Sequence, residues 1–121
     1  MKLIIAGGRD YKFDAQDRMF LDNLRGRQAS LSDPIEEVIT GGAPGADTCG
    51  YIWAVESRLP TKTFRAAWKM YGNAAGPIRN REMAQHCGKD GILVLFPGGK
   101  GTASMRREAQ SVGMKILEPK P

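Results

Sequence analysis

The chain has 121 residues, 41% of them hydrophobic, so it can build the core of one domain without disulfides or metal ions. Its formal net charge of +5 favours anionic partners, but no Lys or Arg run exceeds Arg106-Arg107, which argues against nucleic acid as the main partner. Cys49 and Cys87 form no CxxC pair, and the longest apolar run, residues 92–96, is far shorter than the ~20 residues that cross a bilayer. We therefore expect a single domain, residues 1–121, in a reducing cytoplasm and without membrane association.

Short apolar runs alternate along the chain with segments of helical periodicity. The apolar runs predict strands at residues 2–6, 35–40, 61–66, 91–96 and 114–117. The segments between them predict helices at residues 13–28, 43–58, 77–87 and 102–112. The third helix begins with Pro77, because a missing N–H costs least at the first helical position. Residues 67–77 are expected to form a long loop.

Strands that alternate with helices form right-handed βαβ units and a parallel sheet covered on both faces. The sequence therefore predicts an α/β fold, a Rossmann-like three-layer sandwich around a mainly parallel sheet of about five strands. Ligands of such sheets bind beyond the carboxyl ends of the strands, near the switch in strand order. Three glycine pairs should meet at that edge, Gly7-Gly8, Gly41-Gly42 and Gly98-Gly99.

The first two glycine loops carry candidate ligand-binding groups. In Gly7-Gly8-Arg9-Asp10 the glycines would let a ligand approach the backbone and Arg9 offers a planar fork for phosphate, although the segment could equally be a tight turn with Asp10 as a helix cap. The loop Gly41-Gly42-Ala43-Pro44-Gly45 leads into a helix whose first N–H groups attract anions. Asp47, in that helix, could accept a hydrogen bond from a ribose hydroxyl or hold its own loop.

Two further segments suggest an anion site. Arg79 and Asn80 fall in the first turn of a predicted helix, where a cation opposes the helix dipole unless an anionic ligand or a surface acid compensates it. The loop Pro97-Gly98-Gly99-Lys100-Gly101-Thr102 follows the most apolar strand and opens a helix. Its backbone N–H groups and the Thr102 hydroxyl could bind phosphate, with Lys100 adding a charge or remaining solvated.

Other candidates have less support. His86 is the only histidine and no metal-ligand set can be assembled around it, so we expect neither a metal nor a cofactor. Ser104 has no base nearby in the sequence that could activate it. Trp68 and Tyr71 either stack on a base or cover an edge of the core.

The segments GGRDY, TGGAPGAD, WKMYGNAAGPIRNREM and FPGGKGTASM, in this order, resemble the SLOG superfamily. This group joins the DNA-processing Smf/DprA proteins with the lonely-guy, lysine-decarboxylase-like, cytokinin-activating enzymes. The resemblance runs from Ile4 to Val112 and is greatest to the small stand-alone YspA/YpsA-related branch, formerly a domain of unknown function. It implies binding of a nucleotide or nucleotide-derived ligand, a role as sensor or processor in nucleotide signalling or conflict systems, and a homo-oligomer, because related proteins commonly form dimers or larger assemblies.

The lonely-guy enzymes cleave the N-glycosidic bond of nucleoside 5′-monophosphates and place a Glu three residues after the Thr of their PGGxGT loop. That position is Met105 here, and a thioether can neither stabilise an oxocarbenium ion nor activate water. Their catalytic Arg is similar in position to Arg79. Hydrolysis therefore stays an alternative only with a carboxylate from another loop, and the catalytic candidates are Asp10, Asp47 and Arg79.

Two other carboxylates are alternatives for that role. Glu82 could supply the acid from the helix of Arg79, and Glu108 would need to be re-aimed from one turn beyond Met105. A DprA-like DNA-binding module is a further alternative, which rests on the net charge of +5 alone.

Overall fold

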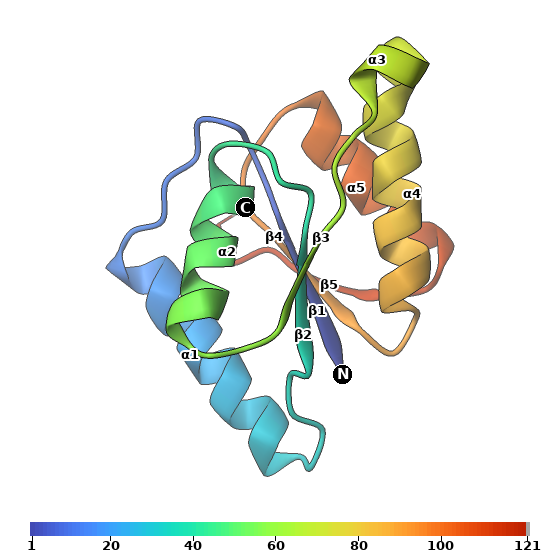
Figure 1. The fold of residues 1–121 in the computed structure, drawn as a ribbon. Coiled ribbons are helices and arrows are strands. Elements are labelled where there is room, and N and C mark those ends of the chain that lie inside the picture. The colour runs from blue at the N-terminus through green and yellow to red at the C-terminus, as the bar shows by residue number, and fades with distance from the viewer. Residues whose placement is uncertain (121) are drawn as a thin grey trace.

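The computed structural model describes residues 1–120, and its centre is an all-parallel five-stranded sheet with the order β3-β2-β1-β4-β5 (Figure 1). The strands are β1 (Lys2–Ala6), β2 (Glu37–Thr40), β3 (Thr61–Thr63), β4 (Ile92–Leu95) and β5 (Lys115–Leu117). The helices are α1 (Ala15–Ser30), α2 (Ala46–Glu56), α3 (Trp68–Tyr71), α4 (Ala75–Cys87) and α5 (Lys100–Ser111), with a short 3₁₀ turn at Gly72–Ala74. The predicted Rossmann-like three-layer sandwich is confirmed.

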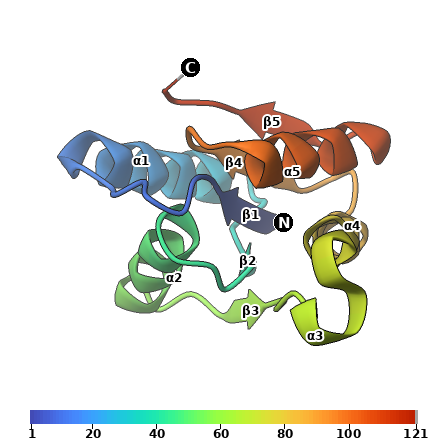
Figure 2. The same cartoon turned by 90° about the horizontal axis from the view of Figure 1, so that it is seen from above.

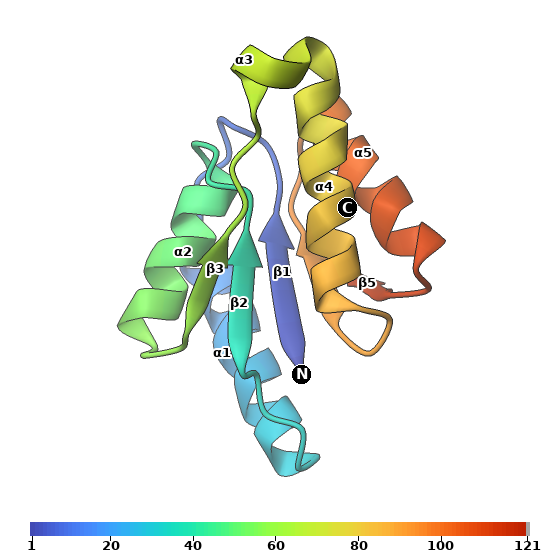
Figure 3. The same ribbon diagram turned by 45° about the vertical axis from the view of Figure 1, so that its right-hand side comes forward.

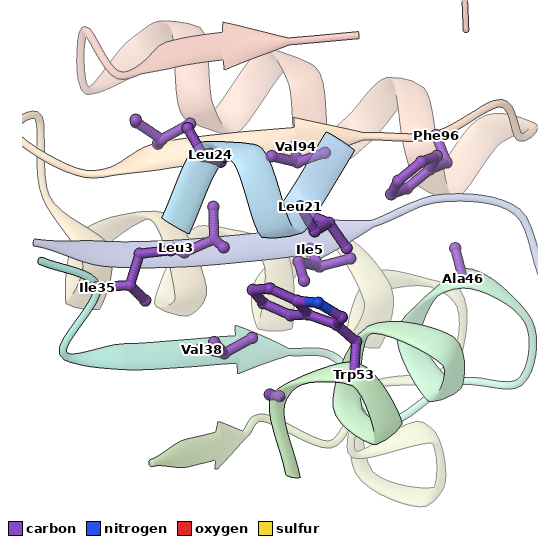
Figure 4. Close-up of a cluster of buried hydrophobic side chains, with 12 residues drawn as sticks. Leu3, Ile5, Leu21, Leu24, Ile35, Val38, Ala46, Trp53, Val94 and Phe96 are labelled. Carbon is purple, nitrogen blue, oxygen red and sulfur yellow. The ribbon is translucent and has the colours of Figure 1, made fainter. Parts of the chain in front are cut away.

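The two faces of the sheet have separate apolar cores. Helices α1 and α2 cover one face and α4 and α5 the other (Figure 2). Successive residues of β1 alternate between them, because side chains in a strand point to opposite faces. Ile5 packs on the α1/α2 side, where Figure 4 shows the Trp53 indole beside it, and Ile4 packs on the side of Met83 and Met105. Such double burial explains the short, continuously apolar strands.

The strand order reverses between β1 and β4, which places the switch point at the centre of the sheet. The chain runs outward from β1 to β3 and then crosses to the other side to form β4. In Figure 3 the strands β1, β2 and β3 point toward the end of the molecule where α3 and the start of α4 lie. All the predicted ligand loops therefore lie at this carboxyl edge of the sheet.

The prediction of a long loop at residues 67–77 is wrong. The segment holds α3, the 3₁₀ turn and the start of α4, so Pro77 is the third residue of α4 and not its first. Proline is still tolerated there, because the first four N–H groups of a helix have no intrahelical acceptor. In this helical segment the Trp68 ring lies close to Gly76, 3.3 Å from the position that a Cβ on Gly76 would take. Sequence periodicity does not indicate such a contact.

Strands β2 to β5 are all shorter than predicted, β4 by two residues and β5 by one. Strand β2 begins at Glu37 and not at Ile35, although Ile35 is buried in the core. Strand β3 ends at Thr63, whereas we expected it to continue to residue 66. No helix within residues 1–120 is long and apolar enough to cross a membrane.

Candidate functional site

The loop after β1 contacts both of the other glycine loops. The Gly8 N–H donates to the Pro97 carbonyl oxygen (2.8 Å), and the Gly8 carbonyl accepts from the Ala46 N–H (3.1 Å) at the start of α2. A Cβ on Gly8 would lie 2.8 Å from the Pro97 oxygen, so the close approach requires glycine. The structure thus brings the three predicted loops together.

Gly45 closes the contact between the loops after β1 and β2. Its φ is +82°, and a Cβ at this position would overlap the carbonyl oxygens of Gly8 and Arg9. Because the Ala46 N–H is used by Gly8, one of the N–H groups that we expected to attract an anion at the start of α2 is already hydrogen-bonded within the protein. Gly42 and Ala43 lie in the irregular segment that precedes this contact.

Arg79 is half-buried at the carboxyl edge. Its Nη1 donates to the Gly41 carbonyl (2.6 Å) and, at 3.4 Å, to the Phe64 carbonyl. Burial lowers the pKa of the Arg79 guanidinium, the negative charge of Asp47 opposes this shift, and the positive charge of Arg9 adds to it. The predicted cations Arg9 and Arg79 therefore come close enough to repel each other.

Asp47 is 6% exposed and lies in the first turn of α2. Its Oδ2 accepts a hydrogen bond from the Ala43 N–H (3.2 Å), so this carboxylate does hold its own loop. Burial raises the pKa of Asp47, against the effects of the Ala43 hydrogen bond and the charge of Arg79. Asp47 also borders a cavity of about 280 Å³, together with Thr40, Thr63 and Arg65.

Asn80 ties α4 to the first turn of α5. Its side chain is 4% exposed, and its Nδ2 donates to the Gly101 carbonyl (3.3 Å) and the Ser104 hydroxyl (3.2 Å). The Arg79 Nε donates to the Asn80 Oδ1 (2.8 Å). A hydrogen-bonded chain thus runs from Gly41 through Arg79 and Asn80 to Gly101. The sequence suggested that Asn80 contacts the ligand, but its side chain is used to hold Arg79 and the start of α5 in position.

The loop after β4 leaves the start of α5 open. Residues 97–101 are exposed, whereas Thr102 is 7% exposed with its hydroxyl against Gly98. Within residues 1–120, no hydrogen bond uses the N–H groups of Gly99, Lys100 and Gly101, and Gly99 brings no capping side chain. These N–H groups can donate to an anion, as the sequence suggested.

A larger cavity, of about 530 Å³, lies between the loop after β1 and the first turns of α2. Its walls include Arg9, Asp10, Tyr11, Phe13, Cys49 and Ile52. Sequence reasoning singled out only Arg9 and Asp10 of these six for the site. The two segments are more than thirty residues apart, so only the fold brings them together.

The structure separates the candidate carboxylates. Asp10 is exposed beside the larger cavity, whereas Glu82 is exposed on α4 and Glu108 pairs with Arg81 (3.4 Å). Met105 is 1% exposed within the core of the α4/α5 face. Asp10 and Asp47 therefore remain as acids near the glycine loops.

Of the remaining candidates, His86 lies away from these loops, whereas helix α3 with Trp68 and Tyr71 lies at the carboxyl edge of the sheet (Figure 3). His86 pairs with Glu37 (2.5 Å), the first residue of β2 and so at the opposite edge of the sheet. Trp68 and Tyr71 are about half-exposed on α3. Arg65 was missed by the sequence reasoning, and it donates to the Gly42 carbonyl (3.4 Å).

No protein-family model matches the chain, and no solved structure is significantly similar to it. The chain is similar to the Gene 61 protein of Mycobacterium phage D29, with 37% identity over 87 residues. The match covers 66% of this chain and 68% of the phage protein. This chain therefore belongs to the family of the phage D29 Gene 61 protein.

Proposed function

We propose that the protein binds a nucleotide or nucleotide-derived ligand and holds its phosphate at the carboxyl edge of the sheet. The observation that carries the proposal is the half-buried Arg79, on which the charge of Arg9 also acts. Burial and a neighbouring cation both disfavour the charged guanidinium, and a bound anion relieves both effects. Because Nε and Nη1 of Arg79 already donate within the protein, the phosphate in this proposal accepts a charge-assisted hydrogen bond from Nη2.

The start of α5 adds a second set of donors. Its exposed glycine N–H groups face solvent, and Asn80 links this turn to Arg79. The sequence motifs support the same ligand class through their resemblance to the SLOG superfamily and its YspA/YpsA-related branch. In this proposal the phosphate contacts come from Arg9, Arg79 and the loop of Gly98 to Thr102.

Titration calorimetry and thermal unfolding test this proposal with inorganic phosphate, the four common nucleoside monophosphates and ADP-ribose. A ligand that binds only the folded state at 100 times its Kd adds about 2.7 kcal/mol of stability. Arg79→Lys keeps the charge but loses the guanidinium, so we expect its affinity to fall roughly tenfold or more. Arg81→Lys, on the exposed side of the same helix, serves as the control. A folded protein that responds to none of these anions overturns the proposal.

A second candidate is hydrolysis of a nucleotide N-glycosidic bond, and Asp47 is the observation that favours it. A buried carboxyl with a raised pKa beside two arginines suits proton transfer. Water would add to the anomeric carbon as the bond to the base breaks, and the base would leave with a proton. Release of free base from a nucleoside monophosphate, abolished in Asp47→Asn, is the expected result, while absence of release from all four would discard this candidate.

A further inference from the structure

We infer that the 530 Å³ cavity between the loop after β1 and α2 binds the nucleobase of the ligand whose phosphate lies at Arg79. The inference rests on the proposed function. It assigns a binding site to the nucleobase, which the proposed phosphate contacts do not locate. A cavity of this volume falls within the range of small-molecule sites.

The lining of the cavity suits the planar ring of a ligand whose negative charge lies on another group, its phosphate. Tyr11, Phe13 and Ile52 provide apolar walls, and predominantly apolar and aromatic linings are typical of small-molecule sites. The cations Arg9 and Lys12 also line the cavity, against the one carboxylate of Asp10. Arg18 lies there too but is paired with Glu56 (3.4 Å).

Arg9 connects this cavity to the proposed phosphate position. It lines the cavity, and its charge acts on both Arg79 and Asp47 at the carboxyl edge. Gly45, which also lines the cavity, packs against the backbone of Arg9. One ligand can therefore contact Arg9 with its phosphate and reach into the cavity with its ring.

The aromatic wall is already held in place. The Tyr11 hydroxyl donates to the Asp17 carboxylate (2.8 Å), which is 1% exposed, and the Tyr11 ring stacks on Phe96 at 5.2 Å. Phe13 lies 4.6 Å from Phe96 between ring centroids. Asp17 also accepts from the Asp14 N–H (3.0 Å) at the start of α1. A preformed wall lowers the entropy cost of ordering side chains around a ligand.

The smaller cavity has about half the volume of the larger one, and most of its side chains are polar. Its volume is about 280 Å³, and Asp47, Arg65 and the hydroxyls of Thr40, Thr48 and Thr63 line it, with Tyr51 as its one aromatic ring. Such groups pair with hydroxyls, so this cavity fits a sugar better than a base. The choice between the two cavities therefore favours the larger one for the base.

Cys49 allows a test on the unmodified protein. It is half-buried and lines the larger cavity, whereas Cys87 is 8% exposed and burial raises its pKa to about 11. Alkylation by N-ethylmaleimide near neutral pH therefore reports on Cys49, and peptide mass spectrometry verifies the site. We expect a nucleoside monophosphate at ten times its Kd to slow this reaction roughly tenfold. Inorganic phosphate at the same saturation should leave the rate unchanged.

A cavity-filling substitution gives the second measurement. Ile52 is 43% exposed, so Ile52→Trp adds bulk to the cavity without entering the core. Val55→Trp, at a 52% exposed position on the same helix outside the cavity lining, is the matched control. We expect Ile52→Trp to weaken nucleoside monophosphate binding by about tenfold or more and to leave phosphate binding unchanged, since only the ring loses its site.

The outcomes separate the two proposals. If phosphate and nucleotide both bind but Cys49 is not protected and Ile52→Trp binds normally, the base lies elsewhere and only this inference is overturned. Equal protection of Cys49 by phosphate alone also overturns it. If neither compound binds the wild-type protein, the proposed function fails and this inference falls with it. Should Ile52→Trp not fold, protection of Cys49 in the native chain decides.

Discussion

The Arg79 Nη1 donates a 2.6 Å hydrogen bond to the carbonyl oxygen of Gly41, a residue 38 positions earlier in the chain. The guanidinium also lies directly over the Gly41 Cα, because a Cβ there would come within 2.6 Å of Nη1 and 2.8 Å of the Asp47 Oδ2. Glycine at position 41 thus allows the cation and the carboxylate to approach the same peptide unit.

Gly41→Ala is expected to displace the ends of both side chains. Because these ends are flexible, the loss of stability should be limited to about 1–2 kcal/mol, near the value of one disturbed hydrogen bond. Phosphate affinity should fall roughly tenfold, because the Arg79 guanidinium leaves its position. Gly26→Ala on α1, where a Cβ meets nothing within 4 Å, is the control in calorimetry and urea unfolding. Unchanged phosphate affinity in a folded Gly41→Ala protein would contradict the placement of phosphate at Arg79.

Gly45→Ala combines an unfavourable backbone angle with a steric overlap. Gly113 has a similar φ, +77° against +82°, but a Cβ there meets nothing within 4 Å. We expect Gly113→Ala to cost about 1 kcal/mol in urea unfolding, the conformational penalty alone. Gly45→Ala should cost about 3 kcal/mol or more, because the Cβ overlaps the carbonyls of Gly8 and Arg9. Equal losses in the two variants would mean that the loops after β1 and β2 separate at little cost.

Met105→Glu would restore the acid of the lonely-guy pattern, and we expect it to destabilise the protein without creating activity. Met105 is 1% exposed among apolar side chains, so a carboxylate there is buried without a partner. The expected loss is about 3 kcal/mol or more in denaturant unfolding. Gln110→Glu, on the exposed side of α5, should change stability little. A stable Met105→Glu protein that released base would show that the side chain can turn toward the rim.

Asp47 should make stability depend on pH. Burial raises its pKa in the folded protein above the ordinary value, so the folded state holds this proton more tightly than the unfolded state. Its contribution to stability is fully present below the ordinary value of 3.8 and is lost as pH rises through the higher, folded-state pKa. Relative to Asp47→Asn, the wild-type protein should therefore lose stability in urea unfolding as the pH rises above 3.8. A constant difference between the two proteins over this range would show that Asp47 is charged at little cost.

The elements that sequence patterns predicted well are those with local causes. Strands β1 and β4 follow from continuous apolar runs, and the glycine pairs behind them lie at the carboxyl edge because the sheet is parallel. Helix α3 was missed; the Trp68 ring at its start lies against Gly76 of α4, and sequence periodicity does not indicate such a contact. The cavity beside Cys49 was missed for a similar reason, since no pattern indicates which loops will face each other.

The role of Asn80 shows the same limit within the site. The sequence predicted it in the first turn of a helix, but it is the sixth residue of α4, and its amide is used by Gly101 and Ser104, 21 and 24 residues away. Side-chain partners at such separations depend on how α4 packs against α5. The sequence therefore predicts that these side chains meet at the carboxyl edge of the sheet, but it does not predict which of them point toward solvent.

The hydrogen-bonded chain from Gly41 through Arg79 and Asn80 to Gly101 has a mechanical consequence. It links loops that follow β2 and β4, two strands that flank β1 and do not touch each other in the sheet. Two adjacent side chains of α4 therefore join the peptide after β2 to the peptide at the start of α5. In the proposed function, a ligand that displaced the guanidinium would act on both of these peptides, which lie on opposite sides of the central strand.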